Sequence, residues 1–192
     1  MDMLLTGLVV FLAAHSVRIF AENWRTHMRE MLGENVFKGA YAVVSLIGLG
    51  LIIWGFGMAR EQPVYLWSPP VGMRHAASLL TLFAFVLLAA AYVPGNAIKA
   101  RMGHPMVLAV KVWALAHLLA NGTVAHVALF GSFLVWSVLC FRAARQRDRA
   151  AGMVYPAATP RGTAITVAAG VVAWAVFAFA LHGWLIGIKP MG

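Results

Sequence analysis

The chain has 192 residues, of which 62% are apolar and only 11% are charged, and its mean hydropathy is +0.82. Soluble domains usually carry about 25% charged residues, so this composition excludes an ordinary soluble protein and predicts an all-α polytopic membrane helix bundle. The net charge of +9 does not indicate nucleic acid, because the basic residues lie in short stretches between apolar runs. The positive-inside rule and contact with anionic lipid account for that placement.

Six apolar segments predict about six transmembrane helices in a single membrane domain, 1–192. Most approach the ~20 residues that cross the hydrocarbon core of a bilayer. The first is expected to be an uncleaved helix, because its basic residues follow the apolar run instead of preceding it. The fourth is shorter, and either stops below the far surface or turns tightly into the fifth. The segments lie near residues 3–21, 37–59, 76–94, 105–120, 123–142 and 163–187, with a basic linker at 143–162 before the last.

The loop charges predict the orientation of the bundle. The poorer set of loops contains only Arg60, Arg74 and Lys189. By the positive-inside rule the richer set is cytoplasmic, which places both termini outside and indicates a bacterial inner membrane. That richer set comprises Arg25, Arg29, Lys38, Lys99, Arg101, Arg142, Arg145, Arg147, Arg149 and Arg161.

Two of the seven histidines, His15 and His117, fall deep inside predicted spans. Counting along the helices puts His15 roughly 18 Å below the outer surface and His117 roughly 18 Å above the inner one. In a core of ~30 Å these depths differ by only ~6 Å. Two neutral imidazoles at similar depth could bind one haem iron from both faces. The simpler alternative is that each ring only bonds to a carbonyl or a neighbouring side chain.

Other polar residues could complete such a site. Basic groups near the haem propionates are expected from Arg18, Lys38, Lys99 and Arg101. Arg18 has a simpler role as an ion-pair partner of Glu22, four residues later. The remaining candidates are Trp113 as a wall for a flat cofactor or simple packing, Asn121 as a helix cap or a donor into the site, Lys111 as a snorkelling or propionate-binding side chain, and His104 near the cytoplasmic surface.

The positions of the acidic residues exclude several functions. None of the six lies deep in a predicted span, whereas a proton pump or cation transporter normally buries a carboxylate. The chain also has no Ser-His-Asp arrangement, phosphate loop or HExxH helix. Its single cysteine, Cys140, excludes an internal disulfide and covalently attached c-type haem.

Four sequence blocks resemble the NnrU family, which includes the zeta-carotene isomerases of plants and cyanobacteria. They are AHSVR at 14–18, GENVFKG at 33–39, GHP at 103–105 and WALAHLLANG at 113–122. The resemblance covers about residues 4–142. It implies a polytopic protein that binds haem b, with the ligand histidines of the isomerases falling at His15 and His117.

The same resemblance shows two departures from the plant isomerases. Their cysteine three residues before the second histidine is replaced here by Ala114, so a ligand exchange that uses that thiol is excluded. A histidine pair in their following helix is replaced by Val135-Trp136, while this chain has His126. The resemblance therefore implies haem binding more directly than isomerase activity.

Four functions remain open at this stage. The leading one is a haem b membrane protein, with His15 and His117 as catalytic residues if it isomerises a membrane-dissolved polyene. The second is a haem electron carrier or a nitric-oxide-related accessory factor in denitrification. The third is a haem-free scaffold, and the fourth is a membrane methyltransferase of the isoprenylcysteine type, whose acidic C-terminal cofactor region is missing here.

Overall fold

The computed structural model describes residues 1–190, and all regular elements in that range are helical. This confirms the all-α prediction. The helices are α1 (Asp2–Phe20), α2 (Glu22–Leu32), α3 (Glu34–Ala59), α4 (Gly72–Tyr92), α5 (Ala97–Met102), α6 (Pro105–Ala120), α7 (Val124–Ala150), α8 (Pro160–Val176) and α9 (His182–Ile186), with the π-helical segment η1 (Phe177–Leu181) joining the last two.

Five helical stretches of the described chain are long and apolar enough to cross a membrane: α1, α3, α4, α7 and the continuous run from α8 to α9. The remaining segment, the fourth in the chain, is α6, which has only 16 residues and turns tightly into α7, one of the two alternatives expected for it. Residues 143–150 of the expected basic linker are helical, because α7 continues to Ala150.

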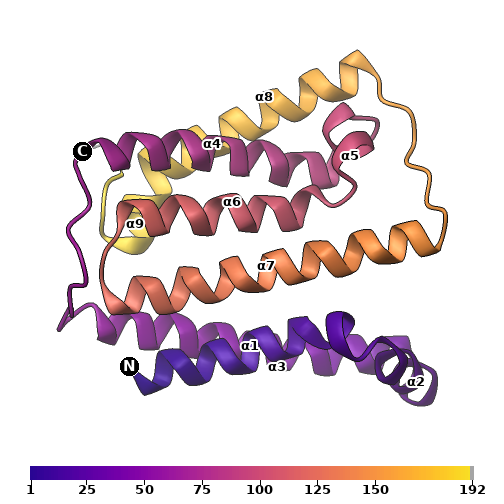
Figure 1. The fold of residues 1–192 in the computed structure, drawn as a ribbon, viewed down its shortest axis with the longest axis horizontal. Helices are drawn as coiled ribbons and strands as arrows, with labels where there is room; N and C mark the ends of the chain where they lie inside the picture. Colours follow the sequence, from indigo (N-terminus) through magenta and orange to yellow (C-terminus); the bar gives the residue numbers. More distant parts are fainter. Residues whose placement is uncertain (191–192) are drawn as a thin grey trace.

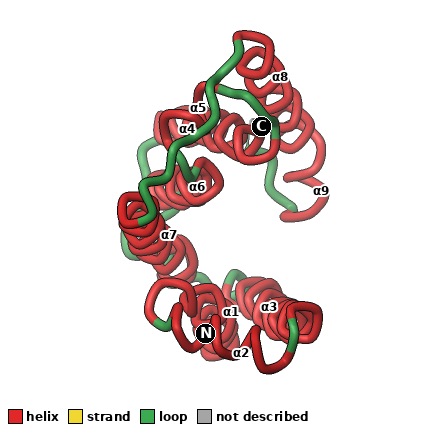
Figure 2. Tube along the Cα trace, turned by 90° about the vertical axis from the view of Figure 1, so that its right-hand side faces the viewer, coloured by secondary structure: helices red, strands yellow, loops and turns green. Residues whose placement is uncertain are grey.

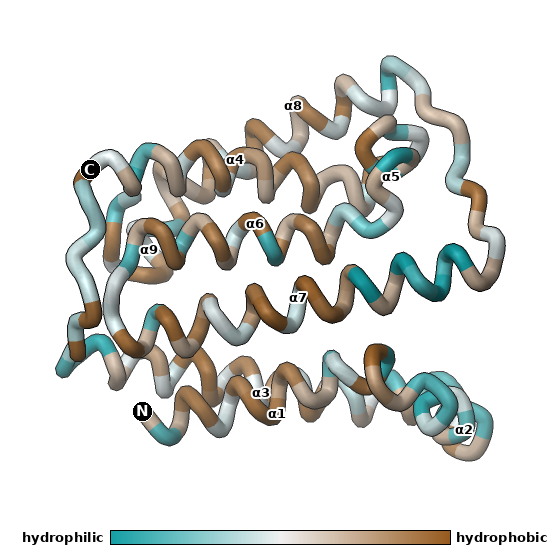
Figure 3. Tube along the Cα trace, viewed as in Figure 1, coloured by the Kyte–Doolittle hydropathy of each residue, from teal (hydrophilic) through white to brown (hydrophobic). Residues whose placement is uncertain are grey.

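Two short helices were not expected from the sequence. Both α2 and α5 lie where basic loops are predicted. Together with the last turns of α7 they form the hydrophilic end of the bundle (Figure 3). The start of α1 and α9 lie at the opposite end (Figure 1). The two sets of loop charges therefore occupy opposite ends, and which end is cytoplasmic stays a prediction.

The long helices form two groups joined by α7. Helices α1 and α3 pack together, while α4 packs against both α6 and α8. Helix α7 contacts α6 on one side and α1 on the other, so it lies between the groups (Figure 2). The buried side chains of the core meet around this helix, and they are Leu4, Leu8, Ile52, Ala114, Ala125, Leu129 and Phe130.

Glycines bring the backbones of α1 and α3 into direct contact. A Cβ atom on Gly48 would lie 2.8 Å from the backbone nitrogen of Phe11, and one on Gly55 would overlap the backbone of Leu4. Gly7 makes the reverse contact, since its Cβ would lie 2.6 Å from the nitrogen of Ile52. Small residues allow this approach in a bilayer, where helices associate by close packing.

The turn between α6 and α7 is held by the connection from α3 to α4. Leu66 donates a backbone hydrogen bond of 2.8 Å to the carbonyl of Gly122, and Val124 donates one of 2.9 Å to Val64. Gly122 has no space for a side chain because the carbonyl of Trp67 lies against it. This fixes the C-terminal end of α6, where His117 lies.

We expect Gly55→Ala to destabilise the protein by about 1–3 kcal/mol, the usual cost of overpacking a tight core contact. The matched control is Gly57→Ala, because a Cβ there meets nothing within 4 Å and alanine favours the helix. Thermal unfolding in detergent measures both. Equal midpoints for the two variants would contradict a backbone contact between α1 and α3 at this position.

Candidate functional site

His15 lies in an aromatic surround made by three helices. Its ring stacks on Phe11 of α1 at 4.0 Å between centroids, with Tyr41 of α3 at 5.2 Å and the edge of Trp136 of α7 at 6.2 Å. Its Nδ1 lies 2.7 Å from the carbonyl oxygen of Phe11. Since a carbonyl only accepts, Nδ1 carries the proton and Nε2 keeps its lone pair.

His117 has the same pose one turn from the end of α6. Its Nδ1 donates to the carbonyl of Trp113 at 2.8 Å, and the Trp113 ring lies 5.2 Å from the imidazole. Phe130 of α7 stacks on the other side at 4.5 Å. Asn121 donates its side-chain amide to the carbonyl of His117 and caps α6. Asn121 is therefore the C-cap of α6, as expected from the sequence.

Both rings are oriented as metal-binding histidines usually are. A ligand histidine commonly donates one ring N–H to a carbonyl, which sets the tautomer and leaves the other nitrogen for the metal. Within residues 1–190, no hydrogen bond is made to Nε2 of either His15 or His117. Each imidazole by itself therefore fits ligation of a haem iron.

The structure does not bring the two imidazoles together. Helix α1 packs against α7 but not against α6. His15 meets α7 at Trp136, whereas His117 meets it at Phe130. Six residues along α7 correspond to roughly 9 Å, while each nitrogen must come within about 2 Å of a metal it binds. The offset therefore exceeds the one expected from the sequence, and ligation of one iron by both histidines stays a prediction.

Aromatic side chains fill the space between the two histidines. Phe11, which stacks on His15, lies 5.8 Å from Phe133 between ring centroids, and Phe133 lies 5.7 Å from Trp113 beside His117. Trp113 therefore packs against protein rings, which is the simple packing role considered for it, and its role as a wall for a cofactor stays a prediction. Sequence reasoning missed Phe11 and Phe130, although Phe11 lies one helical turn before His15, as Trp113 does before His117.

The basic residues expected near haem propionates are dispersed. Arg18 pairs with Glu22 at 3.5 Å and Lys38 pairs with Glu34 at 2.7 Å, both at the hydrophilic end of the α1–α3 pair. Arg101 lies on α5, which packs against the other helix group. The simple ion-pair role considered for Arg18 is confirmed, and these three cations do not form one propionate site.

The family comparison covers almost the entire chain. The family model described as NnrU protein matches residues 3–190. The chain belongs to the NnrU family. No curated protein and no solved structure matches it.

In this NnrU family member, the matched region includes the last apolar helical stretch, from α8 to α9. The four sequence blocks had indicated the family over about residues 4–142, so the match extends beyond them. The relation to the carotenoid isomerases stays a prediction. At the two departures from those enzymes, Ala114 is fully buried in the core and Trp136 lies beside His15 with its indole Nε1–H buried and unpaired.

His104 belongs to a separate polar cluster at the hydrophilic end. Its Nε2 lies 2.9 Å from Oδ2 of Asp148, and the hydroxyl of Tyr155 donates to the same oxygen at 2.6 Å. Arg145 lies 3.6 Å from that oxygen. Because the carboxylate accepts, Nε2 of His104 carries a proton. This histidine therefore links α6 to α7 and to the connection before α8, and its pose differs from that of His15 and His117.

The sequence did not predict that Asp148 and Tyr155 lie beside His104, because both residues are far from His104 along the chain. Burial raises the pKa of Tyr155 to about 12, and the hydrogen bond to Asp148 acts in the same direction. The phenol therefore stays protonated and donates throughout the neutral pH range. Within the described chain no group of three His, Cys, Asp or Glu side chains could hold a metal ion.

We expect Tyr155→Phe to lower the free energy of unfolding by about 1 kcal/mol, because it removes a hydrogen bond to a charged acceptor that is partly exposed to water. Cleavage by a protease at residues 151–159 should become faster in the same variant. Tyr92→Phe is the control, since Tyr92 is 72% exposed. Identical proteolysis rates for wild type and Tyr155→Phe would show that the cluster does not hold the linker.

Proposed function

We propose that this chain is a haem b-binding integral membrane protein of the bacterial cytoplasmic membrane, with His117 and His15 as the iron ligands. The observation that carries the proposal is the shared pose of these two rings. Each donates Nδ1–H to the carbonyl four residues earlier and leaves Nε2 without a partner among the described residues. Membership of the NnrU family and the apolar helices are consistent with this proposal.

The protein residues would act by orientation and by exclusion of water. The bonds to the Phe11 and Trp113 carbonyls fix which nitrogen faces outward. Phe130 and Trp113 around His117, and Tyr41 and Trp136 around His15, make both surroundings apolar. Bound haem would supply redox chemistry and could bind a small ligand.

Isomerisation of a membrane-dissolved polyene is the candidate activity, and one feature favours it. A shallow, mainly apolar groove runs between α1 and α7 and includes Ser16 and Trp136, the residues beside His15 in the chain and in space. A lipophilic molecule could enter there from the side. Electron transfer or a nitric-oxide-related accessory role is the alternative and needs no such groove.

The first test is the absorption spectrum of purified protein supplied with haem, in the oxidised and reduced states. We expect a Soret band that is lost or shifted in His117→Ala and in His15→Ala and unchanged in His75→Ala, because His75 is exposed and outside both aromatic surrounds. Imidazole added to a ligand variant should restore the band if the variant is folded. A wild-type protein without a Soret band would refute the proposal.

The same spectra separate one-histidine from two-histidine ligation. Because the structure holds the two rings at different levels of α7, we expect His15→Ala and His117→Ala to lose unequal amounts of the Soret band if this arrangement persists when haem binds. Equal loss in both variants would show that the helices shift to a common level. Carbon monoxide binding to the reduced form indicates an open position and favours isomerisation, whereas a six-coordinate iron in both redox states favours electron transfer.

A further inference from the structure

Helix α2 lies crosswise to the membrane-spanning helices. Figures 1 and 2 show its axis turned away from those of α1 and α3, at the hydrophilic end of the bundle. It contacts only these two neighbours, and none of its residues is buried. A helix at the end of a transmembrane bundle with this direction lies along the plane of the membrane surface.

One side of α2 is apolar and exposed. Trp24, Met28, Met31 and Leu32 follow the spacing i, i+4, i+7 and i+8, which places them on one helix face. Trp24 is 53% exposed and Met31 is 64% exposed. The opposite face is polar and includes Asn23 and Glu30. Such a helix buries its apolar face in the boundary between headgroups and acyl chains.

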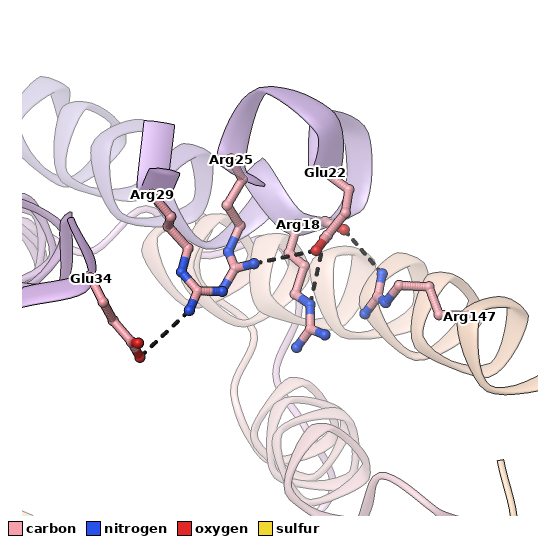
Figure 4. A network of polar contacts seen from close by, with 6 residues as sticks. All are labelled: Arg18, Glu22, Arg25, Arg29, Glu34 and Arg147. Carbon is pink, nitrogen blue, oxygen red and sulfur yellow. Dashed lines mark hydrogen bonds and ion pairs between the residues drawn. The ribbon is translucent and has the colours of Figure 1, made fainter. Parts of the chain in front are cut away.

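The cations around α2 outnumber the carboxylates. Glu22 is shared by Arg18 at 3.5 Å and Arg25 at 3.2 Å. Glu34 is shared by Arg29 at 3.5 Å and Lys38 at 2.7 Å. Figure 4 shows that Arg147 of α7 also reaches this group, where it donates to the carbonyl of Arg18 at 3.0 Å. With Glu30 counted as well, three carboxylates stand against five cations, which leaves positive charge for an anionic partner.

We propose that α2 is an interfacial helix that inserts its apolar face, with Trp24 and Met31, into the bilayer. The surrounding arginines and Lys38 then bind the phosphate of anionic phospholipids. Polybasic segments beside a membrane attract anionic lipid in this way. Phe20, which precedes α2, and Val36, which follows it, are also exposed apolar residues. The inference does not depend on haem binding.

The position of α2 is tested with spin labels on the full chain, in a Cys140→Ser background, reconstituted in bilayers. A label at Met31→Cys should be reached by oxygen, which concentrates in lipid. The matched control at Glu30→Cys should be reached by a water-soluble nickel complex. Equal access of the nickel complex to both labels would overturn the proposal. Protection of the Met31 label from both reagents would overturn it as well, because a protein partner would then cover this face.

The headgroup preference is tested by native mass spectrometry with phosphatidylglycerol and phosphatidylcholine. We expect wild type to retain phosphatidylglycerol in preference, and the double variant Arg25→Gln/Arg29→Gln to lose that preference by roughly tenfold or more. Arg74→Gln is the control, a single substitution of the same kind at the opposite end of the bundle. The proposal fails if wild type shows no preference, or if Arg74→Gln loses it to the same extent.

Discussion

Close approach of the α1 and α3 backbones determines where His15 lies. In a bilayer the surrounding lipid is as apolar as the helices, so association depends on packing. Gly7, Gly48 and Gly55 permit that packing, because a side chain at any of them would enter the backbone of the other helix. The pair then packs against α7, and this contact places His15 between Tyr41 and Trp136.

Helix α7 sets the relation between the two histidines. Helices α1 and α7 run in the same direction, and α6 runs in the opposite one, since α6 and α7 form a tight hairpin. His15 lies toward the C-terminal end of α1, at the hydrophilic end of the bundle, while His117 lies near the C-terminal end of α6, one turn before the hairpin. The aromatic residues of α7 that meet them are therefore separated along the helix. The positions of both ligand candidates follow from the topology of the bundle.

The hydrophilic end uses the few carboxylates of the chain to tie helices together. Glu22 and Glu34 bind the cations around α2, while Asp148 joins His104, Tyr155 and Arg145. No comparable network of ion pairs lies within the described apolar spans. Charge is therefore concentrated where water and lipid headgroups can solvate it, and the interior interactions are those of rings and small residues.

The sequence by itself determined the membrane class, the apolar segments, the separation of basic residues between the two ends, and the NnrU family through four short blocks. These properties follow from local composition and spacing, because a helix that crosses hydrocarbon must be mainly apolar and satisfies its backbone hydrogen bonds within itself. The carbonyl to which each histidine donates also follows from local spacing, because it lies one turn earlier in the same helix.

The level of His15 relative to His117 was decided only by the tertiary structure. An error of a few residues in each expected helix end changes the expected depth of a histidine by several ångströms. That error is larger than the difference in depth between one shared iron site and two separate sites. The same holds for the contact of His104 with Asp148 and Tyr155, which joins residues distant in sequence, and for the crosswise direction of α2.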